Sequence, residues 1–461
     1  MFHIDFNQPI HVHFVGIGGI SMSGLAEILL KRGFKVSGSD LNRATTSDKL
    51  RDLGVQVHIG HKAENIGKDI DLIVYTVAVK LDNPELVQAK ALDIPIIDRA
   101  TLLGQVMEGY ANSIAVAGTH GKTTTTSMVA HILTSATLDP TVSVGGILPL
   151  INGNIHAGSS NYFVTEACEY YNSYHHFYPK VGLVLNVEED HLDFFKDIDE
   201  IRRSFHRFHE NIPSNGALVI QGDTLELDLL TKDLKAQVIT YSDSNQDCDY
   251  YARDISYNAL GHPSFTVMAF GQILCQISLS VPGAHNINNA LGSIATARVF
   301  DIDCQPIIDG LKAFTGTHRR FEFKGDLGGI HIVDDYAHHP TEIKATIDGV
   351  KNMTIGKLHI VFQPHTFTRT KAFLDEFAES LAQADEVILM DIYSASREKD
   401  LGDIHSKDIM EKINALGTPC YYYPTIDEII YHVFTHCVPG DLLITMGAGD
   451  VYLLGDALLK G

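Results

Sequence analysis

Apolar and polar positions alternate along this chain in a pattern that predicts strands followed by helices. Residues 10–15 form a short apolar run, and apolar residues then recur at helical spacing up to Lys31, before a second apolar run at residues 34–39. Further runs with strand or helix patterns lie at residues 72–76, 84–92 and 95–97. Strands that alternate with helices are typical of a parallel sheet. We therefore predict a Rossmann-like α/β domain over residues 1–107.

The remainder of the chain repeats this alternation. In the centre, the runs lie at residues 114–117, 124–133, 162–165 and 181–187, followed by a strand-rich stretch at 216–282 and a helix that reaches residue 300. Four strand and helix pairs follow at residues 330–333 and 340–353, 358–362 and 368–382, 386–392 and 406–416, and 442–446 and 450–459. A chain of 461 residues is long enough for about three domains. We predict a central P-loop ATPase-like α/β domain over residues 108–318 and a C-terminal Rossmann-like α/β domain over residues 319–461.

A glycine-rich loop, G-I-G-G-I-S-M-S-G, follows the first strand at residues 16–24 and opens the first helix. Asp40 follows the second strand, where a dinucleotide-binding turn has the acidic residue that contacts a ribose. Ser21 stands at the third glycine position, so the fingerprint is incomplete and indicates a phosphate-bearing ligand without identifying it. The residues predicted to contact this ligand are Gly18, Gly19, Ile20, Ser21 and Asp40.

The segment A-V-A-G-T-H-G-K-T-T-T-T, residues 115–126, links the first central strand to its helix. A glycine loop at a helix N-terminus directs N–H groups and the positive end of the helix dipole at one place, which suits an anion. Lys122 adds a positive charge, and the Thr123 hydroxyl is suited to a Mg²⁺ ion that bridges nucleotide phosphates. Val116 replaces the first glycine of the usual motif; a glycine turn with a chance Lys-Thr pair is the alternative, which the flanking strand and helix disfavour. The predicted nucleotide contacts are Gly118, Thr119, His120, Gly121, Lys122, Thr123 and Thr124.

Two further central strands end in residues that could bind a metal ion. Glu166 follows the strand at residues 162–165, and the motif E-E-D-H-L-D, which contains His191, follows the strand at 181–187. The carboxyl ends of parallel strands converge on the crevice where ligands bind. We therefore predict that Thr123, Glu166 and His191 hold Mg²⁺. Imidazole is an unusual partner for Mg²⁺, so a hydrogen-bonded core histidine is the alternative for His191.

Polar residues also gather in the last part of the chain. Asn286 and Asn289 lie one helical turn apart and could present amides to a base, although helix capping would explain either residue alone. Two arginines follow a Gly-Thr turn in G-T-H-R-R-F-E-F, where an arginine could reach phosphates from outside the nucleotide domain. The motifs D-D-Y-A-H-H-P, F-Q-P-H-T-F-T-R-T and M-G-A-G-D follow three of the predicted strands, and three polar loops at one sheet edge favour a binding site.

Composition narrows the class of protein. The chain has 35 Lys and Arg against 57 Asp and Glu, a formal charge of −22, so its surface repels nucleic acid and local cations must hold any anionic substrate. Its six cysteines have no metal-ligand spacing, which fits a reducing compartment. The N-terminus lacks the pattern of a signal peptide, and no apolar run is as long as a membrane span. We expect a soluble cytoplasmic protein that is a monomer or a weak homodimer.

Taken together, these motifs resemble the ATP-dependent Mur ligases. The resemblance rests on H-F-V-G-I-G-G, A-G-T-H-G-K-T-T-T-T, E-E-D-H-L-D, P-G-A-H-N, G-T-H-R-R-F-E, D-D-Y-A-H-H-P-T-E-I, F-Q-P-H-T-F-T-R-T and G-A-G-D, which run from residue 13 to 450. His120 and the H-H-P run are similar to the branch of the family that adds L-alanine to UDP-N-acetylmuramate. The resemblance implies ATP and Mg²⁺ as cofactors, and amide formation through an acyl phosphate in peptidoglycan precursor synthesis.

The resemblance also implies roles for individual residues. The N-terminal domain would hold the UDP portion of the substrate, the central domain ATP and Mg²⁺, and the C-terminal domain the amino acid. Lys122 would stabilise the β- and γ-phosphates, and His338 would orient or deprotonate the amine. In this correspondence the metal ligands are Glu166 and His191, the adenine contacts His285 and Asn289, the phosphate contact Arg320, the ATP ribose contact Asp335, and the substrate-pocket residues His338 and Arg369.

Two positions depart from the commonest family pattern, and three alternatives remain open. Cys168 replaces a carboxylate in E-A-C-E, and Thr366 replaces the first arginine of Q-P-H-R-F-T-R. A recycling ligase that joins UDP-N-acetylmuramate to a ready-made tripeptide shares most of these motifs. The loop at residues 16–24 would suit a nicotinamide-dependent oxidoreductase, and a nucleotide-binding regulator without turnover is the third alternative.

Overall fold

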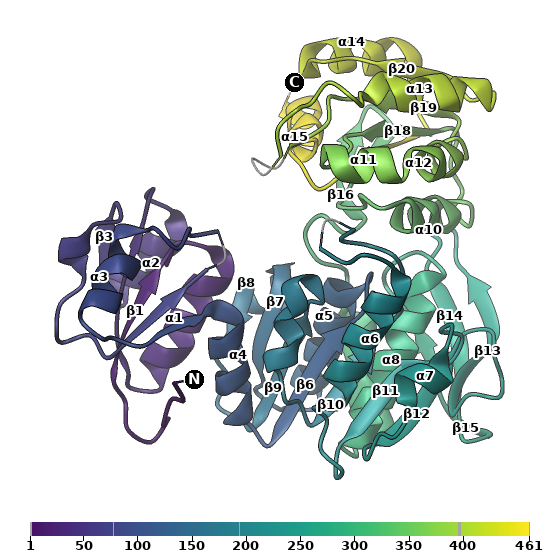
Figure 1. Cartoon of the computed structure of the whole chain (residues 1–461). Coiled ribbons are helices and arrows are strands. Elements are labelled where there is room, and N and C mark those ends of the chain that lie inside the picture. Colours follow the sequence, from purple (N-terminus) through teal and green to yellow (C-terminus); the bar gives the residue numbers. More distant parts are fainter. Residues whose placement is uncertain (1, 77, 193, 395–397, 461) are drawn as a thin grey trace. The chain divides into compact units, whose positions relative to one another are not determined.

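The protein is a mixed α/β structure with three sheets (Figure 1). This computed structural model describes residues 2–76, 78–192, 194–394 and 398–460, so Asp193 of the E-E-D-H-L-D motif lies outside the described residues. The chain divides into two compact units, one of Met1–Tyr250 with Gly292–Gly310 and the other of Tyr251–Leu291 with Leu311–Gly461. Within the described ranges, no helix combines the length and the apolar character needed to cross a membrane.

The N-terminal sheet in the first unit is parallel, with the strand order β3-β2-β1-β4-β5. Its strands are β1 (His11–Val15), β2 (Lys35–Asp40), β3 (Gln56–Ile59), β4 (Leu72–Tyr75) and β5 (Ile96–Asp98), and its helices are α1 (Ile20–Lys31), α2 (Thr45–Asp52), α3 (Pro84–Ala91) and α4 (Arg99–Glu108). A short η1 turn covers Ala63–Asn65. Every residue of β1 is buried, as expected for a central strand with helices on both faces. This order is that of the first five strands of a Rossmann fold, which confirms the predicted class of the N-terminal domain.

The central sheet of the first unit is built around β6 (Asn112–Ala117), which pairs in parallel with both β9 and β10. The other strands are β7 (Thr141–Leu148), β8 (Gly153–His156), β9 (Tyr162–Ala167), β10 (Val181–Val184), β11 (Ala217–Gln221) and β12 (Gln237–Ser242). The helical elements are α5 (Lys122–Ser135), η2 (Pro149–Ile151), η3 (Tyr170–His176), α6 (Ile198–His209) and α7 (Leu227–Thr231). The strand predicted at residues 181–187 ends earlier, because Asn186 instead bonds Thr119 and His120 of the loop that follows β6.

The second unit contains the C-terminal sheet, with the strand order β16-β17-β21-β18-β19-β20. The strands are β16 (Glu322–Leu327), β17 (Ile330–Asp335), β18 (Leu358–Phe362), β19 (Glu386–Leu389), β20 (Cys420–Tyr422) and β21 (Leu442–Met446). The sheet is parallel except for β16, which runs antiparallel to β17 at one edge. The C-terminal part of the chain is thus a Rossmann-like α/β domain with one antiparallel edge strand, as mixed sheets often have.

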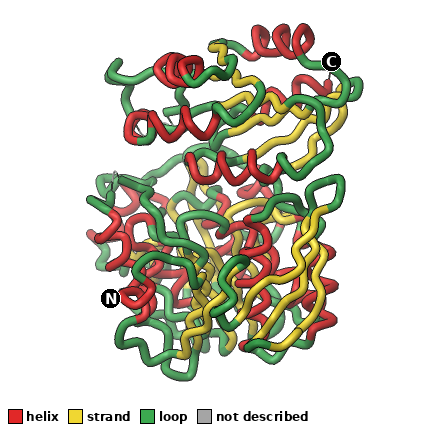
Figure 2. The backbone as a smooth tube through the Cα atoms, turned by 90° about the vertical axis from the view of Figure 1, so that its right-hand side faces the viewer, coloured by secondary structure: helices red, strands yellow, loops and turns green. Residues whose placement is uncertain are grey.

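Helices cover both faces of this sheet (Figure 2). The helices are α10 (Pro340–Val350), α11 (Phe367–Ala372), α12 (Leu374–Leu381), α13 (Ser406–Ala415), α14 (Ile426–His436) and α15 (Tyr452–Lys460). The core on one face includes residues of α10, α12 and α13, and the core on the other includes residues of α14 and α15. The single helix predicted at residues 368–382 is two helices, because Phe373 leaves helical geometry with a φ of −115°.

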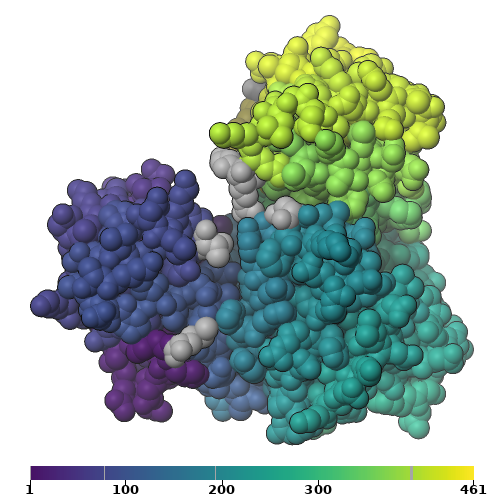
Figure 3. Space-filling view, in the orientation of Figure 1, coloured from purple at the N-terminus to yellow at the C-terminus, as the bar shows by residue number. Residues whose placement is uncertain are grey.

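The remaining elements follow β12 in the sequence, and their three strands belong to the same ten-stranded sheet as β6 and β12. They are β13 (Tyr250–Tyr257), β14 (Pro263–Ala269), β15 (Gln272–Ser278), α8 (His285–Val299) and α9 (Cys304–Ala313). Strands β14 and β15 form an antiparallel hairpin, as the strand-rich pattern predicted. Figure 3 shows one face of the molecule in a space-filling view, with the atoms coloured by residue number.

Candidate functional site

The loop between β6 and α5 has the geometry of a phosphate loop. Gly118 and Gly121 both have positive φ, of 138° and 84°, where a side chain would be strained. A Cβ at Gly118 would also lie 3.0 Å from Leu185 Cβ and 3.2 Å from the Asn186 backbone nitrogen. Gly121 is the N-cap of α5, so Lys122 and Thr123 are the first residues of the helix. The positive end of α5 therefore faces the loop, which favours an anion there.

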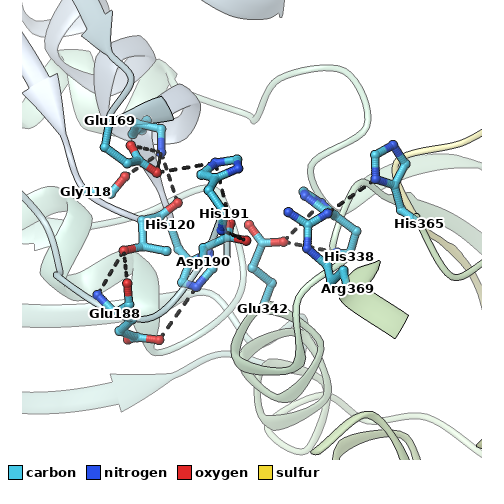
Figure 4. Close-up of polar contacts among 12 residues, drawn as sticks. Gly118, His120, Glu169, Glu188, Asp190, His191, His338, Glu342, His365 and Arg369 are labelled. Carbon is cyan, nitrogen blue, oxygen red and sulfur yellow. Dashed lines mark hydrogen bonds and ion pairs between the residues drawn. The ribbon is translucent and has the colours of Figure 1, made fainter. Parts of the chain in front are cut away.

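Lys122 is held against this loop by a carboxylate that the motif did not identify. Its Nζ donates to the carbonyl oxygens of Gly118 and Thr119 and lies 3.1 Å from Oε2 of Glu169 (Figure 4). Glu169 is only 2% exposed. Burial alone would lower the pKa of Lys122, but the charge and hydrogen bonds of Glu169, together with Cys168 and Glu166, outweigh burial and raise that pKa above its usual value. Lys122 is thus a fully charged ammonium group at the loop.

His191 and Cys168 border the same carboxylate. The Nε2 atom of His191 is 3.6 Å from Oε1 of Glu169, and its ring stacks on Tyr170 with centroids 4.3 Å apart. Three side-chain atoms lie within 4.8 Å of one another: the sulfur of Cys168, a carboxylate oxygen of Glu169 and an imidazole nitrogen of His191. Burial is the main reason that the pKa of the Cys168 thiol is raised to about 11.

Glu166 and Thr123 lie beside the two glycines of β7. The Gly145 N–H donates to Oε1 of Glu166 at 2.6 Å, and a Cβ at Gly145 would lie 2.9 Å from the other carboxylate oxygen. A Cβ at Gly146 would lie 3.2 Å from Cγ2 of Thr123. The glycines therefore lie against the Glu166 carboxylate and the Thr123 side chain, and carboxylate and hydroxyl oxygens are ligands of the kind that Mg²⁺ prefers. These residues fit the metal ion that the motif predicts.

The loop is also tied to the motif that follows β10. Thr119 exchanges hydrogen bonds with the backbone of Glu188, and His120 Nε2 lies 3.6 Å from the Glu188 carboxylate. Asn186 accepts from the His120 N–H at 2.8 Å. Thr124 lies in the first turn of α5, as the helical spacing from residue 124 predicted.

In the N-terminal domain, the glycine loop closes on Asp40. The Gly18 N–H donates to Oδ2 of Asp40 at 2.9 Å, and a Cβ at Gly18 would lie at that same distance from the oxygen, so glycine is required there. Gly19 is the N-cap of α1 and Ile20, its first residue, is exposed. Ser21 accepts a hydrogen bond from Nη1 of Arg99 at 3.1 Å. Gly18 and Asp40, both predicted to contact the ligand, are therefore in contact with each other. Arg99, which was not predicted, contacts Ser21.

In the second unit, the two adjacent arginines have different surroundings. Arg319 donates to Asp334 at 3.0 Å and to the Gly447 carbonyl, so it fastens β17 to the loop after β21. Arg320 lies over the Tyr336 ring, with Nη1 3.8 Å from Glu342. The ion pair of the Arg320 side chain is therefore longer than the hydrogen bonds that hold the Arg319 side chain.

Glu342 of α10 also holds His338. It accepts from the His338 N–H at 3.0 Å, and its carboxylate lies 3.3 Å from the imidazole Nδ1 (Figure 4). The same Nδ1 lies 2.9 Å from the Tyr336 carbonyl. Arg369 lies 3.3 Å from Nδ1 of His365, whose ring is 5.6 Å from that of His338. His338 and Arg369, predicted from two separate motifs, are thus linked through His365.

Three other predicted nucleotide contacts lie in the second unit. Burial lowers the pKa of His285 to about 4, so this imidazole is neutral. Asn289 donates to the Asn286 side chain at 3.0 Å. Burial raises the pKa of Asp335 to about 6, although Thr346 and the Ala337 N–H donate to its carboxylate.

The sequence analysis missed three residues of this geometry. Glu169 lies three residues after Glu166, Glu342 lies in the first turn of α10 and four residues after His338, and Arg99 starts the helix that follows β5. The four-residue spacing between His338 and Glu342 could have indicated in the sequence that the two side chains lie close together. The positions of Glu169 and Arg99 depend on contacts between distant segments, which no local pattern contains.

Three models of Mur ligase domains match successive parts of this chain. The Mur ligase family catalytic domain matches residues 11–111, the Mur ligase middle domain matches 116–297, and the Mur ligase glutamate ligase domain matches 319–449. Two relatives named UDP-N-acetylmuramate–L-alanine ligase are 50% identical to this chain. The one from Lachnospira eligens covers 100% of both chains, and the one from Acetivibrio thermocellus covers 99% of this chain and 97% of its own.

Solved structures give the same result. UDP-N-acetylmuramate–alanine ligase of Thermotoga maritima is similar with a TM-score of 0.80 at 29% identity, covering 98% of each chain. A murein peptide ligase of Psychrobacter arcticus has a TM-score of 0.69 at 27% identity, again covering 98% of each chain. The phosphate loop, the fold and these similarities over the full length agree: the chain belongs to the Mur ligase family.

Proposed function

We propose that this protein is the ATP-dependent ligase that joins the carboxylate of UDP-N-acetylmuramate to the amine of L-alanine. The observation that carries the proposal is the charged Lys122 at the phosphate loop, in a chain that is 50% identical over its full length to enzymes named for this reaction. The product is a precursor of peptidoglycan. Family membership excludes the oxidoreductase that the loop at residues 16–24 alone would suit.

The chemistry follows from the weakness of a carboxylate as an electrophile. A carboxylate oxygen attacks the γ-phosphorus of ATP, ADP leaves, and an acyl phosphate forms. The L-alanine nitrogen then attacks the acyl carbon, and phosphate leaves as the amide forms and the amine loses a proton. Positioning and charge stabilisation supply most of the catalysis in such transfers. In our proposal Lys122 and the N–H groups of the loop hold the β- and γ-phosphates, and Arg320 neutralises charge on the transferring phosphate.

Mg²⁺ is part of this proposal. Thr123 and Glu166 would hold it, because the Glu166 carboxylate borders Gly145 and the Thr123 side chain borders Gly146. His191 is the third proposed ligand, and its Nε2 lies 3.6 Å from the Glu169 carboxylate and 3.8 Å from that of Asp190. When bound, the ion supplies charge neutralisation on the phosphate oxygens.

The remaining proposed roles follow the Mur ligase family. Gly18, Gly19, Ile20, Ser21 and Asp40 hold the UDP portion, His285 and Asn289 contact adenine, Asp335 contacts the ATP ribose, and His338 and Arg369 line the pocket for the amino acid. Neutral His285 suits an uncharged base better than a phosphate. The domain boundaries after residues 107 and 318 stay a prediction, as does a monomer or weak homodimer. We propose a cytoplasmic location, which its six free cysteines fit.

The proposal is tested by phosphate release from ATP with UDP-N-acetylmuramate and either of two amines. We expect release that requires both UDP-N-acetylmuramate and L-alanine, and little with L-alanyl-γ-D-glutamyl-diaminopimelate. Release only with the tripeptide would instead identify the recycling ligase, to which the Psychrobacter structure also points as an alternative. No release with either amine would contradict both and favour a nucleotide-binding regulator.

A further inference from the structure

Glu85, in the first turn of α3, carries a carboxylate that is buried inside the N-terminal domain. Its two oxygens accept hydrogen bonds from Ser39 Oγ and Asn65 Nδ2, each at 2.5 Å, and from the Lys62 N–H at 3.4 Å. The Nδ1 atom of His61 lies 3.2 Å from Oε2 of Glu85. Glu85 therefore joins α3 to β2 and to the segment that follows β3.

A buried carboxylate is costly unless other groups compensate its charge. The His13 imidazole lies 4.0 Å from Oε2 of Glu85. Burial is the main reason that the pKa of His13 is lowered to about 3, so this ring is neutral near pH 7 and supplies no positive charge. Hydrogen bonds from Ser39 and Asn65 and the positive end of α3 instead compensate Glu85. A carboxylate suits this position because it offers acceptor sites for donors from several segments at once.

Glu85 holds the backbone on both sides of Asp40. Ser39 precedes Asp40 in β2 and contacts Glu85 through its hydroxyl. On the other side, the Gly60 N–H donates to the Asp40 carbonyl at 2.7 Å, and His61, the next residue, also contacts Glu85. The carboxylate therefore fixes the backbone at Asp40 from two directions.

The same backbone anchors the glycine loop after β1. The Ser39 carbonyl accepts hydrogen bonds from the N–H groups of Gly16 and Ile17, at 2.8 and 2.9 Å. The Asp40 carboxylate accepts from the Gly18 N–H at 2.9 Å. The loop is thus attached to β2 at the two residues that the buried carboxylate of α3 holds in place.

We propose that Glu85 is a positioning residue for UDP-N-acetylmuramate, which orients Asp40 and the glycine loop without touching the substrate. This inference rests on the proposed function, in which Asp40 and the loop hold the UDP portion. Glu85 and Ser39 are both 0% exposed, so their effect on the substrate passes through the residues that they hold.

Glu85→Gln tests this proposal, because the amide keeps the shape of the side chain but has fewer acceptor sites. We expect the Kd of UDP-N-acetylmuramate, measured by calorimetry with Mg²⁺ and a non-hydrolysable ATP analogue, to rise about 10-fold. The kcat at saturating substrate and the KM for ATP should stay within about 2-fold of the wild-type values. A purely structural role would reduce the amount of folded enzyme, and hence kcat, and leave the Kd of the folded protein unchanged.

Two further variants separate positioning from folding. Leu86, the next residue of α3, is buried in the apolar core of the domain, so Leu86→Ala should lower the unfolding temperature without raising the Kd. Ser39→Ala removes the contact of Glu85 with β2 and should raise the Kd in the same way as Glu85→Gln. Where Glu85→Gln does not fold, Ser39→Ala decides the test. Circular dichroism and thermal unfolding curves establish which variants are folded.

The possible outcomes distinguish this proposal from the ligase assignment. A folded Glu85→Gln or Ser39→Ala protein with the wild-type Kd, or an equal rise in Leu86→Ala, would overturn the positioning role and leave the ligase assignment untouched. A rise confined to the first two variants, in a protein that releases no phosphate, would support the positioning role and contradict the ligase assignment. A wild-type protein that does not bind UDP-N-acetylmuramate would overturn both.

Discussion

At the scale of residues, the Lys122–Glu169 pair is the central feature of the site. Both side chains are largely buried, with 15% and 3% of their side-chain surface exposed, and they lie 3.1 Å apart. A buried pair of this kind stabilises little in net terms, but removal of one partner leaves a buried charge and is costly. Glu169 therefore keeps Lys122 charged in the absence of nucleotide. Bound phosphates can replace Glu169 as the counter-charge of Lys122.

Lys122→Ala removes the charge proposed to stabilise the transferring phosphate. We expect kcat to fall by several orders of magnitude, with the fold intact, because electrostatic stabilisation is commonly the largest catalytic contribution. Steady-state phosphate release measures kcat, and a rapid-quench trap measures acyl phosphate. Near-normal acyl phosphate formation in this variant would remove Lys122 from the mechanism.

Glu169→Gln leaves the Lys122 ammonium buried without its counter-charge. We expect a loss of about 3 kcal/mol in the free energy of unfolding of the nucleotide-free protein, reduced when ATP and Mg²⁺ supply phosphate charge. Denaturant titrations with and without ATP measure both effects. Glu210→Gln, which breaks an exposed pair with Arg207, is the matched control and should cost about 0.5 kcal/mol or less. Equal losses in the two variants would show that Glu169 is not paired as described.

At the scale of elements, the sequence predicted strands and helices best where their apolar pattern is uninterrupted. Strands β18 and β21 have the predicted ends at both sides. Strand β7 was missed because Gly145 and Gly146 interrupt its apolar run, although those glycines make room for the metal ligands. Helix α14 was missed as well; its exposed Tyr431 and Phe434 blur the helical period. Glycines inside a strand and exposed aromatic residues on a helix therefore each obscured the pattern of apolar positions.

The role proposed for β7 predicts the effect of Gly145→Ala. The added Cβ would lie 2.9–3.0 Å from both carboxylate oxygens of Glu166, so the carboxylate must move. We expect the Mg²⁺ concentration for half-maximal activity to rise about 10-fold while the fold is kept. Gly153→Ala in β8 is the control, because its nearest neighbouring atom would be 3.9 Å away. An unchanged Mg²⁺ dependence in Gly145→Ala would argue against Glu166 as a ligand.

The contacts between β18, β19 and the loop before β21 predict a pH dependence of stability. His359 is 2% exposed and bonds Glu386 at 3.0 Å and Asp441 at 3.1 Å. Burial alone would lower the pKa of His359, but the hydrogen bonds that the protonated ring donates to Cys437, Glu386 and Asp441, together with the charge at Cys437, outweigh burial and raise that pKa to about 10. Because the folded pKa lies above the unfolded value, this stabilisation is complete below about pH 6.5 and is lost as the pH rises through 10.

The variant His359→Gln lacks this titration. We expect the wild-type protein to have the larger free energy of unfolding at neutral pH. The difference in this free energy between the two proteins should shrink towards about pH 10. Denaturant titrations of both proteins across this range measure the difference. A difference that stays constant with pH would mean that His359 is not charged in the folded protein.

At the scale of the whole molecule, the proposed site residues are divided between the two compact units. Gly118 to Thr124, Glu166 and His191 lie in the first unit, and His285, Arg320 and His338 lie in the second. The motifs identified most of these residues, because short motifs contain the loop glycines and the catalytic side chains together. They did not identify Glu169 or Arg99, whose positions follow from packing. The sequence pattern predicted three domains, and three family models match successive parts of the chain.

The central claim is that this protein activates the carboxylate of UDP-N-acetylmuramate by phosphoryl transfer. We would label that carboxylate with ¹⁸O and analyse the released phosphate by mass spectrometry in the presence of ATP and L-alanine. Attack of the carboxylate on the γ-phosphorus predicts phosphate that carries one ¹⁸O atom per turnover, since the acyl oxygen leaves with the phosphate. Phosphate without ¹⁸O, released while the amide forms, would contradict the account.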